Sequence, residues 1–189
     1  MANSDSPRGF QPIGHAWGGT GGRFAPTPYK MQSAYGTSLF TGDAVVLTSG
    51  YLARAADDSA LICGIFFGCS YTNADSTNIP FSAYWPASTA TLGSADFTAF
   101  VLDDPGIIYE VQSDTGTAYV QATHLGGSYD IELDHAGSTL TGMSGMELDL
   151  GDTGQTQFLV LGLIDRPGNA VGVNAKLAVR IRKSLVGQA

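Results

Sequence analysis

The chain has 189 residues, about the length of one domain with a substantial buried core. It is 43% hydrophobic and only 14% charged, with a net charge of −8 and nine Lys and Arg in all. This balance argues against nucleic acid as a partner, because phosphate contacts need clustered basic side chains. A surface so poor in charge is easily desolvated, which favours extensive contacts with protein.

The hydropathy pattern predicts no membrane association. No stretch approaches the roughly 20 apolar residues of a membrane span. The opening residues also lack the basic start and the apolar core of a signal peptide. We therefore expect a protein that is made and kept in a cytosol.

The first forty residues are rich in Gly and Pro, a density that prevents a long helix or a central strand. They nevertheless carry scattered aromatic residues and a charge of +2, which leaves −10 for the remainder. We predict an extended arm over residues 1–40 that is ordered by laying its aromatic rings on its own β body or on a neighbouring subunit. The candidate interface residues of the arm are Arg8, Phe10, Trp17, Arg23, Phe24, Tyr29 and Tyr35.

From residue 41 to 189, short apolar runs alternate with turns rich in Gly, Ser and Thr. Strands are predicted at 43–48 and at 61–67, the second buried on both faces. Residues 97–102 and 107–112 are predicted to pair as a hairpin around a type II turn at 103–106. Residues 118–122 fit either a strand or the start of a short helix that ends near Gly126.

Two more strands are predicted near the end of the chain. Residues 158–164 should be buried on both faces. In the last strand Leu177, Val179 and Ile181 form the apolar face. The opposite side of that strand carries Lys176, Arg180 and Arg182. This basic side is either a solvated face, the protected side of an edge strand, or a stripe that meets an acidic partner surface.

Taken together, roughly eight or more short strands without a long amphipathic helix or a repeat predict an all-β fold. The body, residues 41–189, is expected to be a single compact β-barrel or β-sandwich with the arm attached. Cys63 and Cys69 would lie about 20 Å apart on one straight strand. A disulfide needs Cα atoms within roughly 7 Å, so we expect two free, buried thiols.

The usual catalytic signatures are missing, among them a nucleophile elbow, a zinc-protease helix, a paired C-x-x-C and a phosphate loop. His15, His124 and His135 are isolated in sequence. We therefore predict no enzymatic activity, no catalytic residue and no cofactor.

One acidic cluster is a candidate for Ca²⁺, because Asp130, Glu132 and Asp134 would share one strand face. Glu147 and Asp149 alternate similarly further on, and two such strands side by side could supply oxygen ligands. A solvated acidic face explains the same pattern without a ligand, and on that interpretation we predict no metal site.

Several segments resemble those of capsid decoration (cement) proteins, small virion structural proteins of tailed bacteriophages. In chain order they are SPRGFQP (6–12), LFTGDAV (39–45), YWPA (84–87), VLDDP (101–105), YEVQ (109–112), SGMELD (144–149) and DRPGN (165–169). The resemblance runs nearly end to end and lies in the shared order of the segments. It implies a virion protein on the capsid exterior, made in the bacterial host cytoplasm.

The resemblance also implies partners, namely the major capsid protein and further copies of the chain in a homotrimer. The expected function is to clamp adjacent capsid subunits, with the arm bridging subunits and the body forming the trimer. The alternative is a carbohydrate-binding or host-attachment module that uses Trp85 and Tyr84, although Trp85 is better interpreted as a core or interface anchor. A third possibility is an envelope-degrading enzyme that depends on His124 or His135.

Overall fold

The computed structural model describes residues 3–16, 24–56, 59 and 61–186, and within them it confirms the predicted all-β fold. The first sheet has the antiparallel order β1 (Gln11–His15), β10 (Ile107–Gln112), β14 (Lys176–Ile181), β13 (Phe158–Leu163), β11 (Ser128–Glu132) and β12 (Glu147–Asp149). The second has the order β2 (Thr27–Met31), β9 (Phe97–Leu102), β6 (Gly64–Thr72), β4 (Ala44–Thr48) and β5 (Tyr51–Arg54), with β7 (Asn78–Ser82) beside β6.

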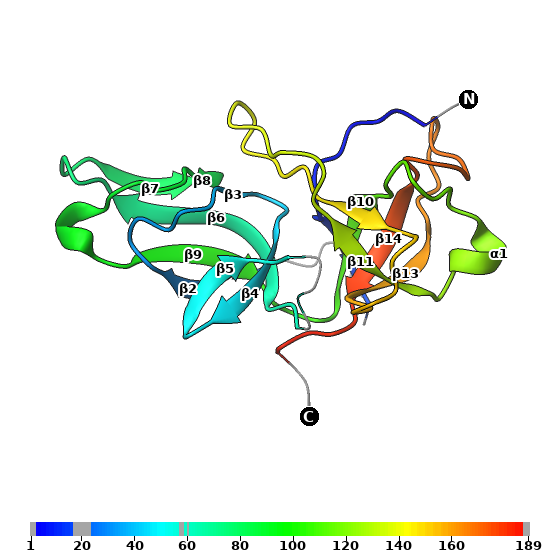
Figure 1. The fold of residues 1–189 in the computed structure, drawn as a ribbon, viewed down its shortest axis with the longest axis horizontal. Helices are drawn as coiled ribbons and strands as arrows, with labels where there is room; N and C mark the ends of the chain where they lie inside the picture. Colours follow the sequence, from blue (N-terminus) through cyan, green and yellow to red (C-terminus); the bar gives the residue numbers. More distant parts are fainter. Residues whose placement is uncertain (1–2, 17–23, 57–58, 60, 187–189) are drawn as a thin grey trace.

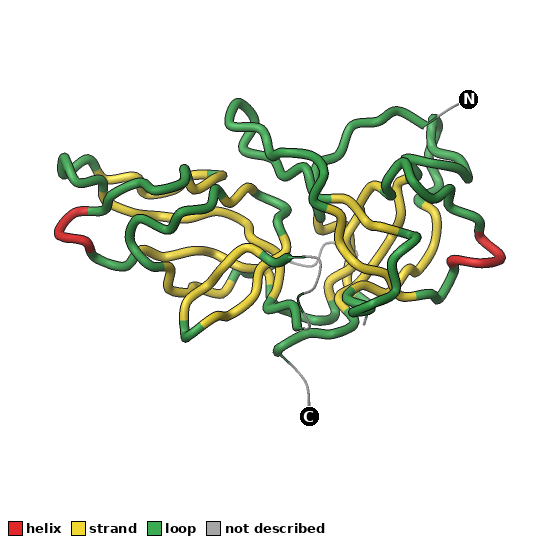
Figure 2. Tube along the Cα trace, in the orientation of Figure 1, coloured by secondary structure: helices red, strands yellow, loops and turns green. Residues whose placement is uncertain are grey.

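A two-stranded sheet of β3 (Leu39–Phe40) and β8 (Tyr84–Trp85) accompanies the second sheet. The helical segments of the described chain are short, a 3-10 turn at Leu92–Ser94 and α1 at Gln121–His124. The two large sheets occupy opposite ends of the long axis of the molecule (Figure 1). Long loops connect the strands (Figure 2), and the sheets are open and sandwich-like rather than closed into a barrel.

The first forty residues are built into both sheets. They supply β1 to the first sheet and β2 to the second, and each of these strands lies at a sheet edge. Edge positions suit segments rich in Pro and Gly, because a proline has no backbone N–H to donate and is tolerated where no neighbouring strand needs that donor. Phe10 is fully buried, with its ring stacked on Phe158 at 4.2 Å and edge-on to Tyr109 at 6.5 Å. The arm was predicted to lie either on its own β body or on a neighbouring subunit. Phe10 packs on the β body of its own chain.

The predicted hairpin at 97–112 is wrong, although both strands have the predicted bounds. β9 pairs with β2 and β6, whereas β10 pairs with β1 and β14, so the two strands belong to different sheets. A turn does form at 104–107, where the Ile107 amide donates to the Asp104 carbonyl at 3.1 Å, but the predicted type II turn is wrong because Gly106 does not have a positive φ. Asp103 is held at the second sheet by hydrogen bonds from Thr27 and Tyr29, both 2.8 Å, and the chain then crosses to the first sheet.

Two hydrophobic cores lie in the described chain. The larger core joins the inner face of the first sheet to residues of the second sheet such as Ile65 and Leu102. The smaller core lies within the second sheet, where Trp85 is fully buried and stacked on Phe97 at 3.8 Å. This confirms Trp85 as a core anchor. Cys63 and Cys69 are free and buried, as predicted.

The remaining strand predictions meet different outcomes. β13 is buried on one face only, since Leu161 is exposed, so its predicted burial on both faces is wrong. The alternation of β14 is confirmed, but β14 lies between β10 and β13, which rules out the edge-strand interpretation of its basic side. Near Gly126 the helix alternative is correct, because α1 forms there.

Candidate functional site

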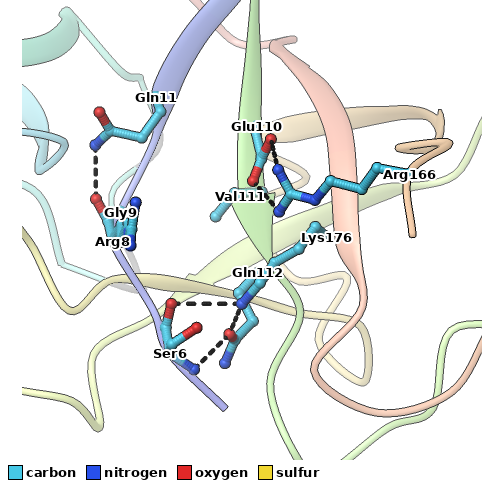
Figure 3. A pocket seen from close by; sticks show the side chains of 9 residues that line it. All are labelled: Ser6, Arg8, Gly9, Gln11, Glu110, Val111, Gln112, Arg166 and Lys176. Atoms are coloured by element: carbon cyan, nitrogen blue, oxygen red, sulfur yellow. Dashed lines mark hydrogen bonds and ion pairs between the residues drawn. The ribbon is translucent and has the colours of Figure 1, made fainter. Parts of the chain in front are cut away.

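A polar cleft of about 500 Å³ lies on the first sheet, where the N-terminal segment passes beside β10 and β14 (Figure 3). Strand alternation explains why the cleft is polar. Tyr109, Val111 and Leu177 turn their side chains toward the core. The polar residues between them are left for the opposite face. The lining residues are Ser6, Arg8, Gly9, Gln11, Glu110, Val111, Gln112, Arg166 and Lys176.

The rim of the cleft carries a bidentate ion pair between Glu110 of β10 and Arg166. The two guanidinium nitrogens of Arg166 donate to the two carboxylate oxygens of Glu110 at 3.0 and 2.6 Å, as Figure 3 shows. Paired hydrogen bonds of this geometry fix the orientation of both groups. The loop after β13 is therefore attached to β10, and one of the cations at the cleft is already neutralised.

Lys176 forms the half-buried floor of the cleft. Its Nζ donates to the side-chain oxygen of Gln112 and to the carbonyls of Ser4 and Ser6, the last two at 3.4 Å. Burial lowers the pKa of Lys176, while nearby carboxylates, Glu147 first among them, act in the opposite direction. This lysine therefore holds the N-terminal strap, which we define as residues 3–9, against the sheet.

Gln112 is the centre of the network that fastens the strap. Its amide nitrogen donates to Asp5 at 2.8 Å and to Glu147, and its oxygen accepts from the Ser6 amide at 2.9 Å. Burial raises the pKa of Glu147, although the Gln112 hydrogen bond and the nearby His135 oppose that shift. His135 Nδ1 lies 2.7 Å from the other carboxylate oxygen of Glu147. The strap is thus held by paired polar groups.

The far end of the strap is held as firmly. The Asn3 side chain donates to the carbonyls of Ala170 and Val173, both at 2.8 Å, and accepts from the Ala170 amide at 2.8 Å. These bonds replace those that the exposed loop would otherwise make with water. The strap therefore bridges β10, β14 and the loop that precedes β14.

The two acidic strands do lie side by side, with Asp130 opposite Asp149 and Glu132 opposite Glu147. Protein donors satisfy the buried carboxylates, however. Asp130 accepts from the backbone amides of residues 155 and 157 at 2.6 and 3.0 Å. In the described part of the chain no group of three or more His, Cys, Asp or Glu is arranged to hold a metal ion. Asp130 and Glu147 are buried, so the solvated-face interpretation is wrong for these two.

The cleft brings together two predicted residues that are distant in sequence, Arg8 of the arm and Lys176 of the basic strand. Arg180 follows on the same face of β14, and Arg182 is exposed just beyond the strand end. The alternation of β10 was the available signal for Glu110 and Gln112, which sequence reasoning did not select. The interface role of the predicted residues Arg8, Lys176, Arg180 and Arg182 stays a prediction.

Other predicted arm residues pack within the chain. Tyr29 donates to Asp103, and burial raises the pKa of its hydroxyl. The Tyr35 hydroxyl accepts from the Arg54 amide at 3.0 Å, and Phe24 packs against the larger core. Trp17 and Arg23 lie outside the described residues.

The three histidines contact different parts of the chain. His15 lies 3.0 Å from Asp104, and the His124 ring accepts from the Val120 amide at 2.8 Å. His135 is paired with Glu147 as described above. This arrangement offers no common site for the hydrolytic role considered for His124 or His135.

The aromatic residues proposed for a carbohydrate-binding role are also occupied. Trp85 is fully buried, and Tyr84 is half-buried with its ring stacked on Phe40 at 5.6 Å. The buried Trp85 ring has no face open to a sugar, and Phe40 covers one face of the Tyr84 ring.

Comparisons with known proteins found no matching family model, no similar curated protein and no similar solved structure. No helix among the described residues has the length and apolar character to span a membrane. The function is accordingly inferred from the residues and their geometry.

Proposed function

We propose that the chain is a capsid decoration (cement) protein that binds the outer surface of a tailed-phage icosahedral shell and stabilises contacts between major capsid subunits. The observation that carries this proposal is the meeting of Arg8 and Lys176 at one cleft, with Arg180 further along the same face of β14, on a chain of net charge −8. We call these three residues the cationic face. The resemblance to phage decoration proteins supports the same assignment.

The cationic face suits a protein partner. Arg8 is exposed, and the strap and sheet beneath it are rigidly bonded, so its guanidinium is free to receive a carboxylate of an acidic capsid surface. Charge complementarity of this kind steers association and sets the register of the complex. In this proposal the arm contributes a residue to the binding face, and bridging of subunits by a free arm is not required.

An apolar contact accompanies the charged one. The loop between β11 and β12 projects from the body (Figure 1), and Leu140 in this loop is 93% exposed. A large apolar side chain so fully exposed gains free energy when a partner covers it. We include Leu140 in the capsid-binding surface. The proposal also includes self-association of the chain as a trimer.

The first test asks whether the chain is a virion component. Mass spectrometry of purified tailed-phage virions identifies the particle that carries the chain, and cryo-electron microscopy of that particle locates it. The proposal expects density at three-fold positions on the outer shell. Absence from the shell, or a place in the tail, would overturn it.

The second test uses charge reversal. Arg8→Glu and Arg180→Glu should each weaken binding of the purified protein to capsids by about tenfold, equivalent to 1.4 kcal/mol. Lys30→Glu is the matched control, because Lys30 is an exposed cation on β2 in the other sheet. Cosedimentation with capsids at two salt concentrations measures the effect. Equal binding by all three variants would contradict the role of the cationic face.

A further inference from the structure

A cluster of exposed aromatic rings covers part of the outer face of the second sheet, away from the cationic face. Phe67 of β6 and Phe81 of β7 are 38% and 52% exposed, and Phe100 of β9 is half-buried. The ring centroids of Phe67 and Phe81 are 6.1 Å apart, and those of Phe81 and Phe100 are 6.4 Å apart with planes inclined by only 25°. The three rings form one surface, which we call the aromatic face.

A bulge and a glycine in β6 place the rings of the aromatic face. The register of β6 against β9 shifts between Phe66 and Gly68, and this bulge leaves Phe67 on the outer side. A Cβ added at Gly68 would lie 2.5 Å from the Phe81 ring, so Phe81 rests directly on the glycine backbone. A glycine inside a strand marks such close approach.

A polar cleft of about 420 Å³ adjoins the aromatic face, because Pro80, the neighbour of Phe81, is among its lining residues. Its sheet side presents the hydroxyls of Ser70 and Thr98, which are cross-strand partners, and its far side includes Asn78 and Asp96. Asp96 is the one charged side chain among the lining residues, and it accepts a hydrogen bond from Tyr51 at 3.2 Å.

We propose that the aromatic face and this cleft together bind a neutral glycan. A sugar ring has an apolar C–H face, which can cover an aromatic ring, and hydroxyl groups, which pair with hydroxyl, amide and carboxylate side chains. An apolar wall with a few convergent polar groups is also the general form of small-ligand sites. Nucleic acid does not fit, because no cation lines the cleft.

This inference is independent of the proposed capsid contact. The cationic face belongs to the first sheet and the aromatic face to the second, at the other end of the molecule (Figure 1). Both surfaces can therefore be occupied at once. Failure of one proposal leaves the other unaffected.

Isothermal titration calorimetry with defined probes tests the inference. The probes are maltoheptaose, cellohexaose, laminarihexaose and mannohexaose, with polygalacturonate as an acidic comparison. We expect at least one neutral oligosaccharide to bind, and EDTA to leave its affinity unchanged because no metal cluster lies among the described residues. Binding of none of the neutral probes, or binding abolished by EDTA, overturns the proposal.

Two variants locate the site. Phe81→Ala should weaken the binding of the same probe by about tenfold, which corresponds to 1.4 kcal/mol. Thr98→Val, which replaces the hydroxyl with a methyl group of similar size, should weaken it by a smaller factor. Ile13→Ala is the matched control, an exposed apolar residue of the first sheet. Thermal unfolding confirms that each variant is folded, and unchanged affinity in Phe81→Ala refutes the assignment.

Discussion

Replacing Phe10 with alanine should lower the free energy of unfolding by about 3–5 kcal/mol, the usual cost of truncating a buried phenylalanine. The ring is fully buried in the larger core, where it stacks on Phe158 with the planes inclined by 15° and meets Tyr109 edge-on at 88°. Each such aromatic pair adds about 0.5–1.5 kcal/mol beyond the buried area. The neighbouring backbone cannot collapse into the space easily, because β1 is fixed to β10 by its ladder.

Urea unfolding followed by tryptophan fluorescence measures the change. With a denaturant slope of about 2 kcal/mol per molar, a loss of 4 kcal/mol moves the midpoint down by about 2 M. Ile13→Ala in β1, the strand that follows Phe10, is the control and should move the midpoint far less, because Ile13 is 47% exposed. Equal shifts for the two variants would show that Phe10 is not a core residue and that the N-terminal segment is free to bind a neighbour.

Three further predictions concern buried groups. Cys63 and Cys69 should react with Ellman's reagent only in denaturing urea, because both are buried and burial raises the pKa of Cys69 to about 12; fast reaction of the native protein would contradict this. Gly64→Ala should cost about 1–3 kcal/mol in thermal unfolding, since its methyl group would lie 2.5 Å from the Leu102 carbonyl oxygen, whereas Gly14→Ala meets nothing within 4 Å and serves as the control. Burial raises the pKa of Glu147 above its ordinary value of 4.5, so the protonated form favours folding; relative to Glu147→Gln, the natural protein should be most stable below pH 4.5 and lose that advantage as the pH rises, and a pH-independent difference would refute the reasoning.

Strand positions were predictable where the signal is local. The alternation of Leu177, Val179 and Ile181 predicts which face of β14 is buried, because successive side chains in a strand point in opposite directions. Strand pairing was not predictable in the same way. The turn at 103–106 reverses the chain locally, but partners are chosen by the burial of each strand's apolar face and by hydrogen bonds such as that from Tyr29 to Asp103.

The candidate site was predictable in part. Arg8 was selected as part of the basic arm and Lys176 as part of the basic side of the last strand, yet nothing in the sequence indicates that they line one cleft. The alternation of β10 is the only sequence signal for Gln112, and it is a weak one, since an amide at the end of a strand resembles any solvent-facing polar residue. Its central position arises from the meeting of the strap, β10 and the Glu147 strand. The aromatic face was missed because it depends on a bulge and on β6–β7–β9 pairing.

The crossing from β9 to β10 has a mechanical consequence. Asp103 is bonded to β2, the Tyr109 hydroxyl donates to the Leu102 carbonyl at 3.1 Å, and Leu102 and Ile107 are buried in the same core. A force applied to one sheet is therefore transmitted to the other through these hydrogen bonds and core contacts, because no flexible linker separates β9 from β10. Under tension the two sheets should unfold together in a single step. The protection of the β9 and β10 amides against hydrogen exchange should be lost at the same time.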